Sequence, residues 1–289
     1  MPELPEVEVV KKSLENEIIN LTVKDVKIFD DKLRYKVKKR DINKIKGLKI
    51  IKINRRSKYL LFFFNKKIVM LAHLGMTGKF FVSKNNNEIH KTSFYYDIKK
   101  NNIKKHNRLV FHLNSKTKLI YNDVRKFGFI KLDKIETINK NIHLRNLGPE
   151  PLNQSFNYQY FKNYLKGKKR RIKDLMMDQK FVSGLGNIYV NEILFVSRVR
   201  PSRRINKIKD FEIKKIVKST KNILKNAIIL GGSSIKDFAN SEGKSGSFQQ
   251  KFNVYSKKGY KCSNPDCKSL IKKIILSNRA SFFCSACQK

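Results

Sequence analysis

Apolar residues recur at helical spacing near the start of the chain. Four of them share one face of a 3.6-residue period: Val7, Val10, Leu14 and Ile18. Pro5 suits the first helical turn, and Glu6 and Glu8 complement the positive end of a helix dipole. The pattern predicts a helix over residues 5–18, preceded by a short arm.

The pattern then changes to strands as far as about residue 132. Six segments combine β-branched and aromatic residues with stretches of period two: 21–29, 58–64, 67–75, 108–113, 118–124 and 126–132. Such a series is typical of a β-sandwich or barrel. Residues 84–105 are polar and rich in Lys and Asn, which predicts a long loop.

A linker, LGPEPL at 147–152, precedes a helical half. We expect helices over 158–166, 171–180, 188–196 and 209–229, the last ended by two glycines at 231–232. The Gly- and Ser-rich stretch 231–248 reads as a mobile connection. The chain is thus an α+β protein, with expected domains at 1–135, 150–230 and 254–289.

Charge adds a class of partner. The chain of 289 residues carries 65 Lys and Arg against 23 Asp and Glu, a formal net charge of +42. Such a surface favours a polyanion such as nucleic acid, although Lys, Asn and Ile are abundant throughout and part of the charge reflects that composition. No apolar run approaches the roughly 20 residues of a membrane span, and the N-terminus lacks the features of a signal peptide. We therefore expect a cytoplasmic protein without a membrane partner.

All four cysteines lie near the C-terminus, with the spacing Cys262-x4-Cys267-x16-Cys284-x2-Cys287. Two close pairs of thiolates separated by such a spacer match one tetrahedral, structural Zn²⁺. The residues between the pairs, 272–283, read as strand, turn and strand. The alternative is four buried free cysteines.

The N-terminus offers a nucleophile. An α-amine has a pKa of about 7.7–8.0, against about 10.4 for lysine, so it loses its proton more easily near neutral pH. If Met1 is removed, Pro2 presents a secondary amine, whose iminium with a sugar carbon remains cationic and accepts electrons during elimination of phosphate. Glu3 beside it is suited to proton transfer. Taken alone, Pro-Glu at a chain start is simply a helix entry.

Six motifs in register change that interpretation: MPELPEVE at 1–8, RRSKYLLF at 55–62, HLGMTG at 73–78, NDVRKFG at 122–128, GLGNIYVNE at 184–192 and the terminal cysteine hairpin. Together they resemble bacterial formamidopyrimidine-DNA glycosylase, and the resemblance spans Pro2 to Lys289. It implies an N-terminal β-sandwich with a leading helix, a helix-two-turn-helix domain and a zinc hairpin. It also implies a monomer that removes oxidised purines, such as 8-oxoguanine and formamidopyrimidines, from damaged double-stranded DNA and nicks it by β,δ-elimination.

The resemblance also implies roles for individual residues. Pro2 resembles the Schiff-base nucleophile, Glu3 the proton donor to the sugar, Lys58 the proton donor for β-elimination and Arg279 that for δ-elimination. Glu6 resembles a neighbouring site carboxylate. The residues that resemble DNA contacts are His106, Arg125, Lys168 and Asn187, and those that resemble the wedge filling the gap left by the flipped base are Met76, Arg125 and Phe127.

Two departures from the family pattern carry expectations. Four residues, 263–266, separate the first cysteine pair where many relatives have two, and they should bulge outward without altering the four thiolates. Val124 and Lys126 stand where relatives often have proline and arginine, which predicts a looser wedge loop.

Two other functions compete with this one. A basic zinc-hairpin protein that binds DNA without chemistry would explain the charge and the cysteines, but not Pro2, Glu3, Lys58 and Arg279 together. The sister enzyme for oxidised pyrimidines is disfavoured by PELPE, the HLGMTG loop and the long segment at 231–250.

Overall fold

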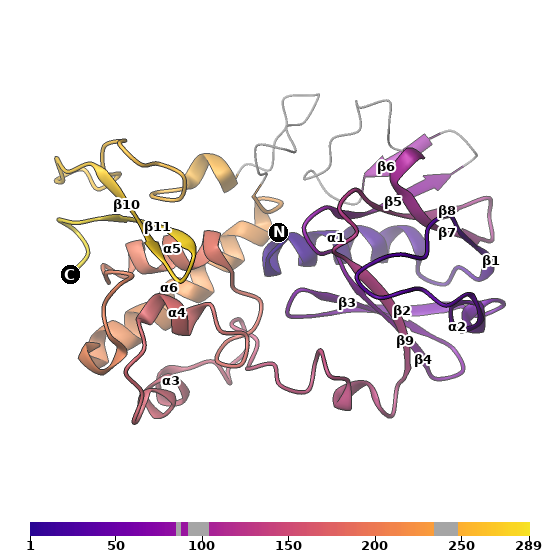
Figure 1. Ribbon diagram of the computed structural model, residues 1–289, viewed down its shortest axis with the longest axis horizontal. Coiled ribbons are helices and arrows are strands. Elements are labelled where there is room, and N and C mark those ends of the chain that lie inside the picture. Colours follow the sequence, from indigo (N-terminus) through magenta and orange to yellow (C-terminus); the bar gives the residue numbers. More distant parts are fainter. Residues whose placement is uncertain (85–87, 92–103, 234–247) are drawn as a thin grey trace. The chain divides into compact units, whose positions relative to one another are not determined.

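The structure is a computed structural model that describes residues 1–84, 88–91, 104–233 and 248–289 (Figure 1). The chain forms two compact units. Unit 1 comprises Met1–Arg145 and Leu230–Gln249, and unit 2 comprises Asn146–Ile229 and Gln250–Lys289. Most of the predicted loop at 84–105 and of the predicted connection at 231–248 lies outside the described residues. None of the helices within the described ranges has the length and apolar character needed to cross a membrane.

Unit 1 begins with helix α1, Leu4–Ile18, which confirms the helix predicted from periodicity. Its four predicted apolar positions are at most 2% exposed. They pack into one core with side chains from both sheets of the unit. A second, short helix, α2, spans Lys39–Ile42. Single 3-10 turns occur at Asn43–Ile45, Lys104–His106 and Ile138–Lys140.

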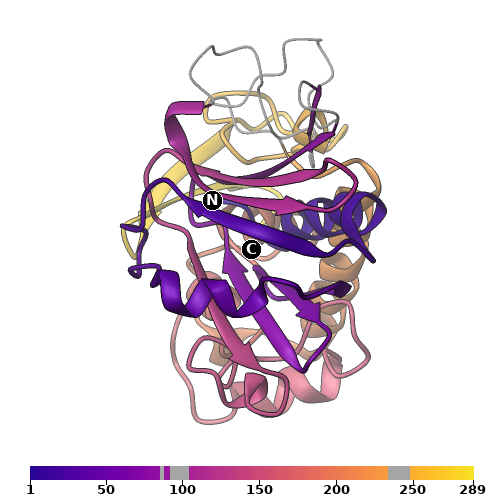
Figure 2. The same ribbon diagram turned by 90° about the vertical axis from the view of Figure 1, so that its right-hand side faces the viewer.

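Two antiparallel sheets form the β-sandwich of unit 1, and Figure 2 shows them as separate layers. In spatial order the five-stranded sheet contains β1 (Val23–Ile28), β7 (Asn107–Leu113), β8 (Lys118–Asp123), β5 (Gly78–Lys84) and β6 (Glu88–Lys91). The four-stranded sheet contains β2 (Ile50–Arg56), β3 (Tyr59–Phe64), β4 (Ile68–His73) and β9 (Phe129–Lys134). Aromatic side chains pack between the layers: for example, the ring centroids of Phe62 in β3 and Phe80 in β5 lie 5.5 Å apart.

All six predicted strands are present, with ends shifted by at most three residues. The sequence did not predict β2, β5 or β6. Strand β6 lies within the stretch 84–105 that was expected to be a loop, and it forms because it pairs with β5. Strand β2 alternates poorly, because only Ile50 and Ile53 of its seven residues are buried, and β5 starts at a glycine. Both are strands because of their partners: β2 pairs with β3, and β5 with β8.

Unit 2 contains four helices among its described residues: α3 (Tyr158–Leu165), α4 (Ile172–Met176), α5 (Asn187–Val196) and α6 (Asp210–Ile229). Strands β10 (Ile271–Leu276) and β11 (Arg279–Cys284) form the predicted hairpin. Single 3-10 turns occur at Ile205–Lys207 in unit 2 and at Phe248–Lys251, where the chain re-enters it.

The helix predicted over 171–180 was wrong in extent, because α4 ends at Met176. The side chains that follow bond to loop backbone instead of continuing the helix. Asp178 accepts a hydrogen bond from the backbone N–H of Lys180 at 2.9 Å, and Gln179 accepts one from Gly184 at 2.8 Å. Such local bonds compete with helical ones.

Glu192 of α5 binds the chain segment 253–255, which precedes the cysteines. This carboxylate is 2% exposed and accepts four hydrogen bonds. The donors are the backbone N–H groups of Asn253, Val254 and Tyr255 and the side-chain amide of Asn253, all at 2.8–3.0 Å. A buried charge satisfied in this way fixes the chain that leads into the hairpin.

Candidate functional site

The N-terminal arm brings carboxylates and cations around the chain's amine. Pro2 is buried, and Glu3, at 3% exposure, is the N-cap residue of α1. Burial lowers the pKa of the Met1 amine below its ordinary value of 8.0. Glu3 and Glu6 oppose this pKa shift, while Lys58 and Arg125 add to it. A larger share of the amine is therefore uncharged near neutral pH than in a free peptide.

Glu6 holds the arm in place. Its Oε2 accepts the backbone N–H of Glu3 at 2.9 Å. Its Oε1 accepts both the backbone N–H and the hydroxyl of Ser233, at 2.8 and 2.9 Å. Gly232, with φ +83°, approaches so closely that a Cβ there would lie 3.1 Å from Oε1. Glu6 thus acts as a structural link between α1 and the chain that follows α6.

Lys58 sits in the tight turn between β2 and β3 and is 7% exposed. The preceding residue, Ser57, has φ +56°. Arg55 braces this turn: its Nε donates to Glu8 of α1 at 2.6 Å, and its Nη1 donates to the Ser57 carbonyl at 3.0 Å. The turn that carries Lys58 is therefore anchored to the helix that carries Glu3.

Three of the predicted residues line one pocket of unit 1, of about 560 Å³, together with Met1. They are Met76, from the turn between β4 and β5, and Arg125 and Phe127, from the loop between β8 and β9. Met76 and Phe127 are 38% and 45% exposed, so both apolar side chains reach the surface at this pocket. The Arg125 guanidinium lies over the Phe127 ring at 4.6 Å.

The loops that carry these residues are cross-braced by Asp123. Its Oδ1 accepts the Thr77 hydroxyl at 2.5 Å, and its Oδ2 accepts the backbone N–H of Gly128 at 2.8 Å. Thr77 in turn accepts the backbone N–H of Arg125 at 2.9 Å. Lys126 has φ +58° and pairs with Asp30 at 2.6 Å. The looser wedge loop expected from Val124 and Lys126 is therefore held by several polar contacts.

His73 also lines this pocket, although its role was not predicted from the sequence. Burial lowers its pKa to about 4, and Lys58, Arg34 and His143 act in the same direction. The ring is thus neutral near pH 7. Its Nδ1 accepts the Gly75 N–H at 3.1 Å, so Nε2 carries the proton and acts as a donor. The motif HLGMTG contained this residue, but only its burial among cations at the pocket makes it a candidate site residue.

His106 does not line that pocket. It ends a 3-10 turn before β7, and its Nδ1 lies 3.4 Å from the Arg108 guanidinium. Burial, Arg108 and Lys105 lower its pKa. The Nε of Arg108 donates to the Asp123 carbonyl at 2.8 Å, so His106 is linked to the braced loops although it does not line the pocket.

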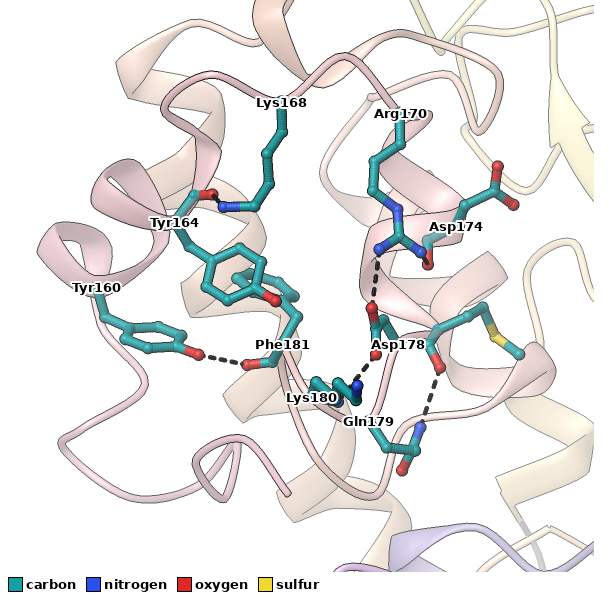
Figure 3. A network of polar contacts seen from close by, with 10 residues as sticks. Tyr160, Tyr164, Lys168, Arg170, Asp174, Asp178, Gln179, Lys180 and Phe181 are labelled. Carbon is teal, nitrogen blue, oxygen red and sulfur yellow. Dashed lines mark hydrogen bonds and ion pairs between the residues drawn. The ribbon is translucent and has the colours of Figure 1, made fainter. Parts of the chain in front are cut away.

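In unit 2, Lys168 lies just after α3, whereas Asn187 begins α5 and contacts the hairpin. Lys168 donates to the Tyr164 carbonyl at 2.6 Å and lies 4.1 Å from that residue's ring, as Figure 3 shows beside the Tyr160–Phe181 contact. Asn187 is the first residue of α5, and its side-chain amide donates to the Ala280 carbonyl of the hairpin at 3.0 Å. Asn187 thus lies next to the residue that follows Arg279.

The loop that leads into α5 is shaped by Gln179, which Figure 3 shows with its neighbours. Its amide nitrogen donates to the carbonyls of Met177 and Leu185, while its oxygen accepts the Gly184 N–H. Arg170, which precedes α4, pairs at 2.8 Å with Asp178, which follows that helix. These contacts set the backbone of the GLG turn, whose following N–H groups begin a helix and suit an anion.

The four cysteines come together as predicted. All four sulfurs lie within 4.8 Å of one another, and two pairs are closer: Cys262 and Cys287 at 3.8 Å, and Cys267 and Cys284 at 3.6 Å. A disulfide would need about 2.0 Å. Zn–S bonds of about 2.3 Å place the corners of a tetrahedron about 3.8 Å apart. The cluster could hold a metal ion, and its four sulfurs suit Zn²⁺.

Comparisons with known proteins agree with this architecture. The formamidopyrimidine-DNA glycosylase N-terminal domain matches residues 1–130, and the formamidopyrimidine-DNA glycosylase H2TH domain matches residues 147–239. A formamidopyrimidine-DNA glycosylase of Rickettsia bellii is 41% identical over 289 residues, the whole of both chains. One of Rickettsia felis is 38% identical over 288 residues, covering 100% of this chain and 98% of the relative.

Solved structures of the Lactococcus lactis enzyme are similar as well. Its complex with abasic-site DNA has a TM-score of 0.85 at 31% identity and covers 99% of both chains. Its complex with DNA containing FAPY-dG has a TM-score of 0.85 at 31% identity and covers 99% of this chain and 100% of that one.

Proposed function

The chain belongs to the formamidopyrimidine-DNA glycosylase family, whose members are DNA glycosylases and abasic-site lyases of base-excision repair. We propose that it removes oxidised purines from double-stranded DNA and then cuts the strand by β,δ-elimination. Its substrates would be duplexes with 8-oxoguanine or formamidopyrimidine lesions. It would act as a cytoplasmic monomer with one structural Zn²⁺ held by the four cysteines.

One observation carries the chemistry: buried Pro2 is followed by buried Glu3, and at this end of the chain burial, Lys58 and Arg125 lower the pKa of the terminal amine, against the opposing effect of Glu3 and Glu6. Removal of Met1 would move the terminal amine one residue inward, to buried Pro2. The unprotonated Pro2 nitrogen would attack the sugar C1′ while the bond from C1′ to the base breaks, and the proton that this nitrogen loses would balance the one taken up by the departing base. Glu3 would protonate the ring oxygen as the sugar opens, leaving an iminium.

The iminium would then act as the electron sink for two eliminations. Loss of a C2′ proton breaks the C3′–O bond and releases one phosphate, and Lys58 is proposed as the proton donor for this step. Loss of a C4′ proton breaks the C5′–O bond, and Arg279 is proposed as the donor for this second step. A metal held by four thiolates has no open position for substrate and would stabilise the hairpin.

The remaining predicted residues would bind DNA. We assign His106, Lys168 and Asn187 to the backbone, and Met76, Arg125 and Phe127 to the gap that base extrusion leaves, since apolar wedges offset unstacking. The exposure of Met76 and Phe127 beside Met1 supports this role. The domains would be 1–135 for catalysis, 150–230 for the helix-two-turn-helix and 254–289 for the zinc hairpin.

Borohydride trapping tests the nucleophile. Reduction of the iminium should give a covalent adduct with DNA containing 8-oxoguanine, and Pro2→Gly should lose most lyase activity. The matched control is the same chain with Met1 retained, which should form no adduct. Trapping at the full level with Met1 retained would exclude Pro2.

A lesion panel in the same assay tests the substrate class. Preferred trapping with oxidised purines supports the proposal, and preferred trapping with oxidised pyrimidines would contradict it. DNA binding without any adduct would favour the non-catalytic alternative.

A further inference from the structure

Lys173 is a lysine buried inside unit 2. It lies on α4 and is 1% exposed, between the buried apolar residues Ile172 and Leu175. Burial lowers its pKa to about 8, with Asp174 raising it and Arg279 lowering it further. Burying an ammonium group costs free energy unless hydrogen bonds compensate, so the acceptors of Lys173 indicate its structural role.

Both hydrogen-bond acceptors of Lys173 lie on the hairpin. Its Nζ donates to the Ala280 carbonyl at 2.8 Å and to the Ser281 hydroxyl at 2.6 Å. These residues are 107 and 108 positions further along the chain. The Ala280 carbonyl also accepts the side-chain amide of Asn187 at 3.0 Å. The contact therefore fixes the backbone of β11 immediately after Arg279.

The turn on the other side of Arg279 is held by the same helix. Ser277 and Asn278 form a two-residue turn with φ of 46° and 57°. The Ser277 hydroxyl donates to Asp174 at 2.9 Å. Lys173 and Asp174 of α4 therefore hydrogen-bond to the chain on both sides of Arg279. The side chain of Arg279 itself is exposed.

We propose that Lys173 is a positioning residue that sets the direction of Arg279 by fixing the hairpin backbone at Ala280 and Ser281. This rests on the proposed role of Arg279 in δ-elimination. A displacement of about 1 Å at a reacting group can slow a step by about 100-fold, so a loosened β11 should slow the second elimination selectively. Base release and β-elimination, assigned to residues of unit 1, should persist.

The test uses four proteins: wild type, Lys173→Met, Arg279→Ala and the double variant. Methionine has a similar volume, and replacing a buried charge by an apolar group is often neutral for stability, so Lys173→Met should fold. Lys162→Met is the matched control, because Lys162 is an exposed lysine of the same unit, paired with Asp210. Zinc content and the melting temperature of each variant verify folding.

Single-turnover cleavage of abasic DNA separates β-product from δ-product. We expect Lys173→Met to lower the δ-to-β rate ratio by about tenfold or more, with DNA affinity and the β-step within about twofold of wild type. Lys162→Met should leave the ratio unchanged. The double variant should equal Arg279→Ala alone, because two residues acting through one group are not additive.

Three results would overturn the inference: an unchanged ratio in folded Lys173→Met, an equal loss in both steps, or effects that multiply in the double variant. Failure of the proposed function is distinguishable, since Arg279→Ala would then itself form δ-product normally. If Lys173→Met does not fold, Ser281→Ala removes one acceptor of the same contact. It should lower the ratio in the same direction, and an unchanged ratio in that variant would also overturn the inference.

Discussion

Replacing Asp123 tests whether the wedge loops must be preorganised to extrude a base. This residue ends β8 and is fully buried. Its carboxylate joins the turn that carries Met76, through Thr77, to the loop that carries Phe127, through Gly128. Asp123→Ala removes both links, while Asp123→Asn keeps the shape but removes the charge.

The magnitude follows from these two hydrogen bonds. Each has a charged acceptor and contributes about 1.5–3 kcal/mol, so Asp123→Ala should cost about 3–6 kcal/mol of stability in this region. Tyr121, whose hydroxyl lies 3.3 Å from Oδ2, can donate instead to the His73 carbonyl at 3.5 Å. Asn has one acceptor oxygen in place of two: it can keep the bond from the Gly128 N–H as a neutral bond, while its NH2 group donates to the Thr77 hydroxyl, whose direction reverses. Neutral bonds have roughly half the strength, which predicts a cost of about 1–3 kcal/mol.

The assay compares a substrate that needs base extrusion with one that does not. For Asp123→Asn, excision of 8-oxoguanine opposite cytosine should slow by about 5–150-fold, the rate equivalent of about 1–3 kcal/mol. Cleavage of a preformed abasic site should change by less than about threefold. Asp133→Asn is the matched control, because Asp133 bonds Thr137 and Asn141 away from the wedge loops. Equal slowing on both substrates, or none on either, would refute the reasoning.

Two further predictions concern the metal and the orphaned base. Cys284→Ser should release one Zn²⁺ per chain and weaken DNA binding while leaving unit 1 folded, and a native protein without zinc by metal analysis would contradict this. Arg125→Ala should lower the preference for 8-oxoguanine opposite cytosine over adenine by roughly 5–150-fold, since a lost bidentate contact is worth about 1–3 kcal/mol. Arginine offers donors alone, which match the acceptors of cytosine. An unchanged ratio would place opposite-base recognition elsewhere.

The sequence by itself determined the features that depend on local pattern or on a complete motif. Helix α1, the six predicted strands and the β10–β11 hairpin follow from periodicity, and the cysteine spacing predicted the sulfur cluster. Six motifs in register identified the family. Each periodic segment and each motif is a local signal, because it lies within a short stretch of the chain.

Only the tertiary structure decided which polar residues are buried and what they bind. Lys173 closely follows the run GKKRR, a pattern that predicts solvent-exposed charge. It is nevertheless buried, beside the apolar residues Ile172 and Leu175, and its hydrogen-bond acceptors lie more than one hundred residues further along the chain. Strand β2 likewise exists because β3 pairs with it, and His73 is neutral because of the cations packed around it. Such properties belong to contacts between distant segments, and no local pattern encodes them.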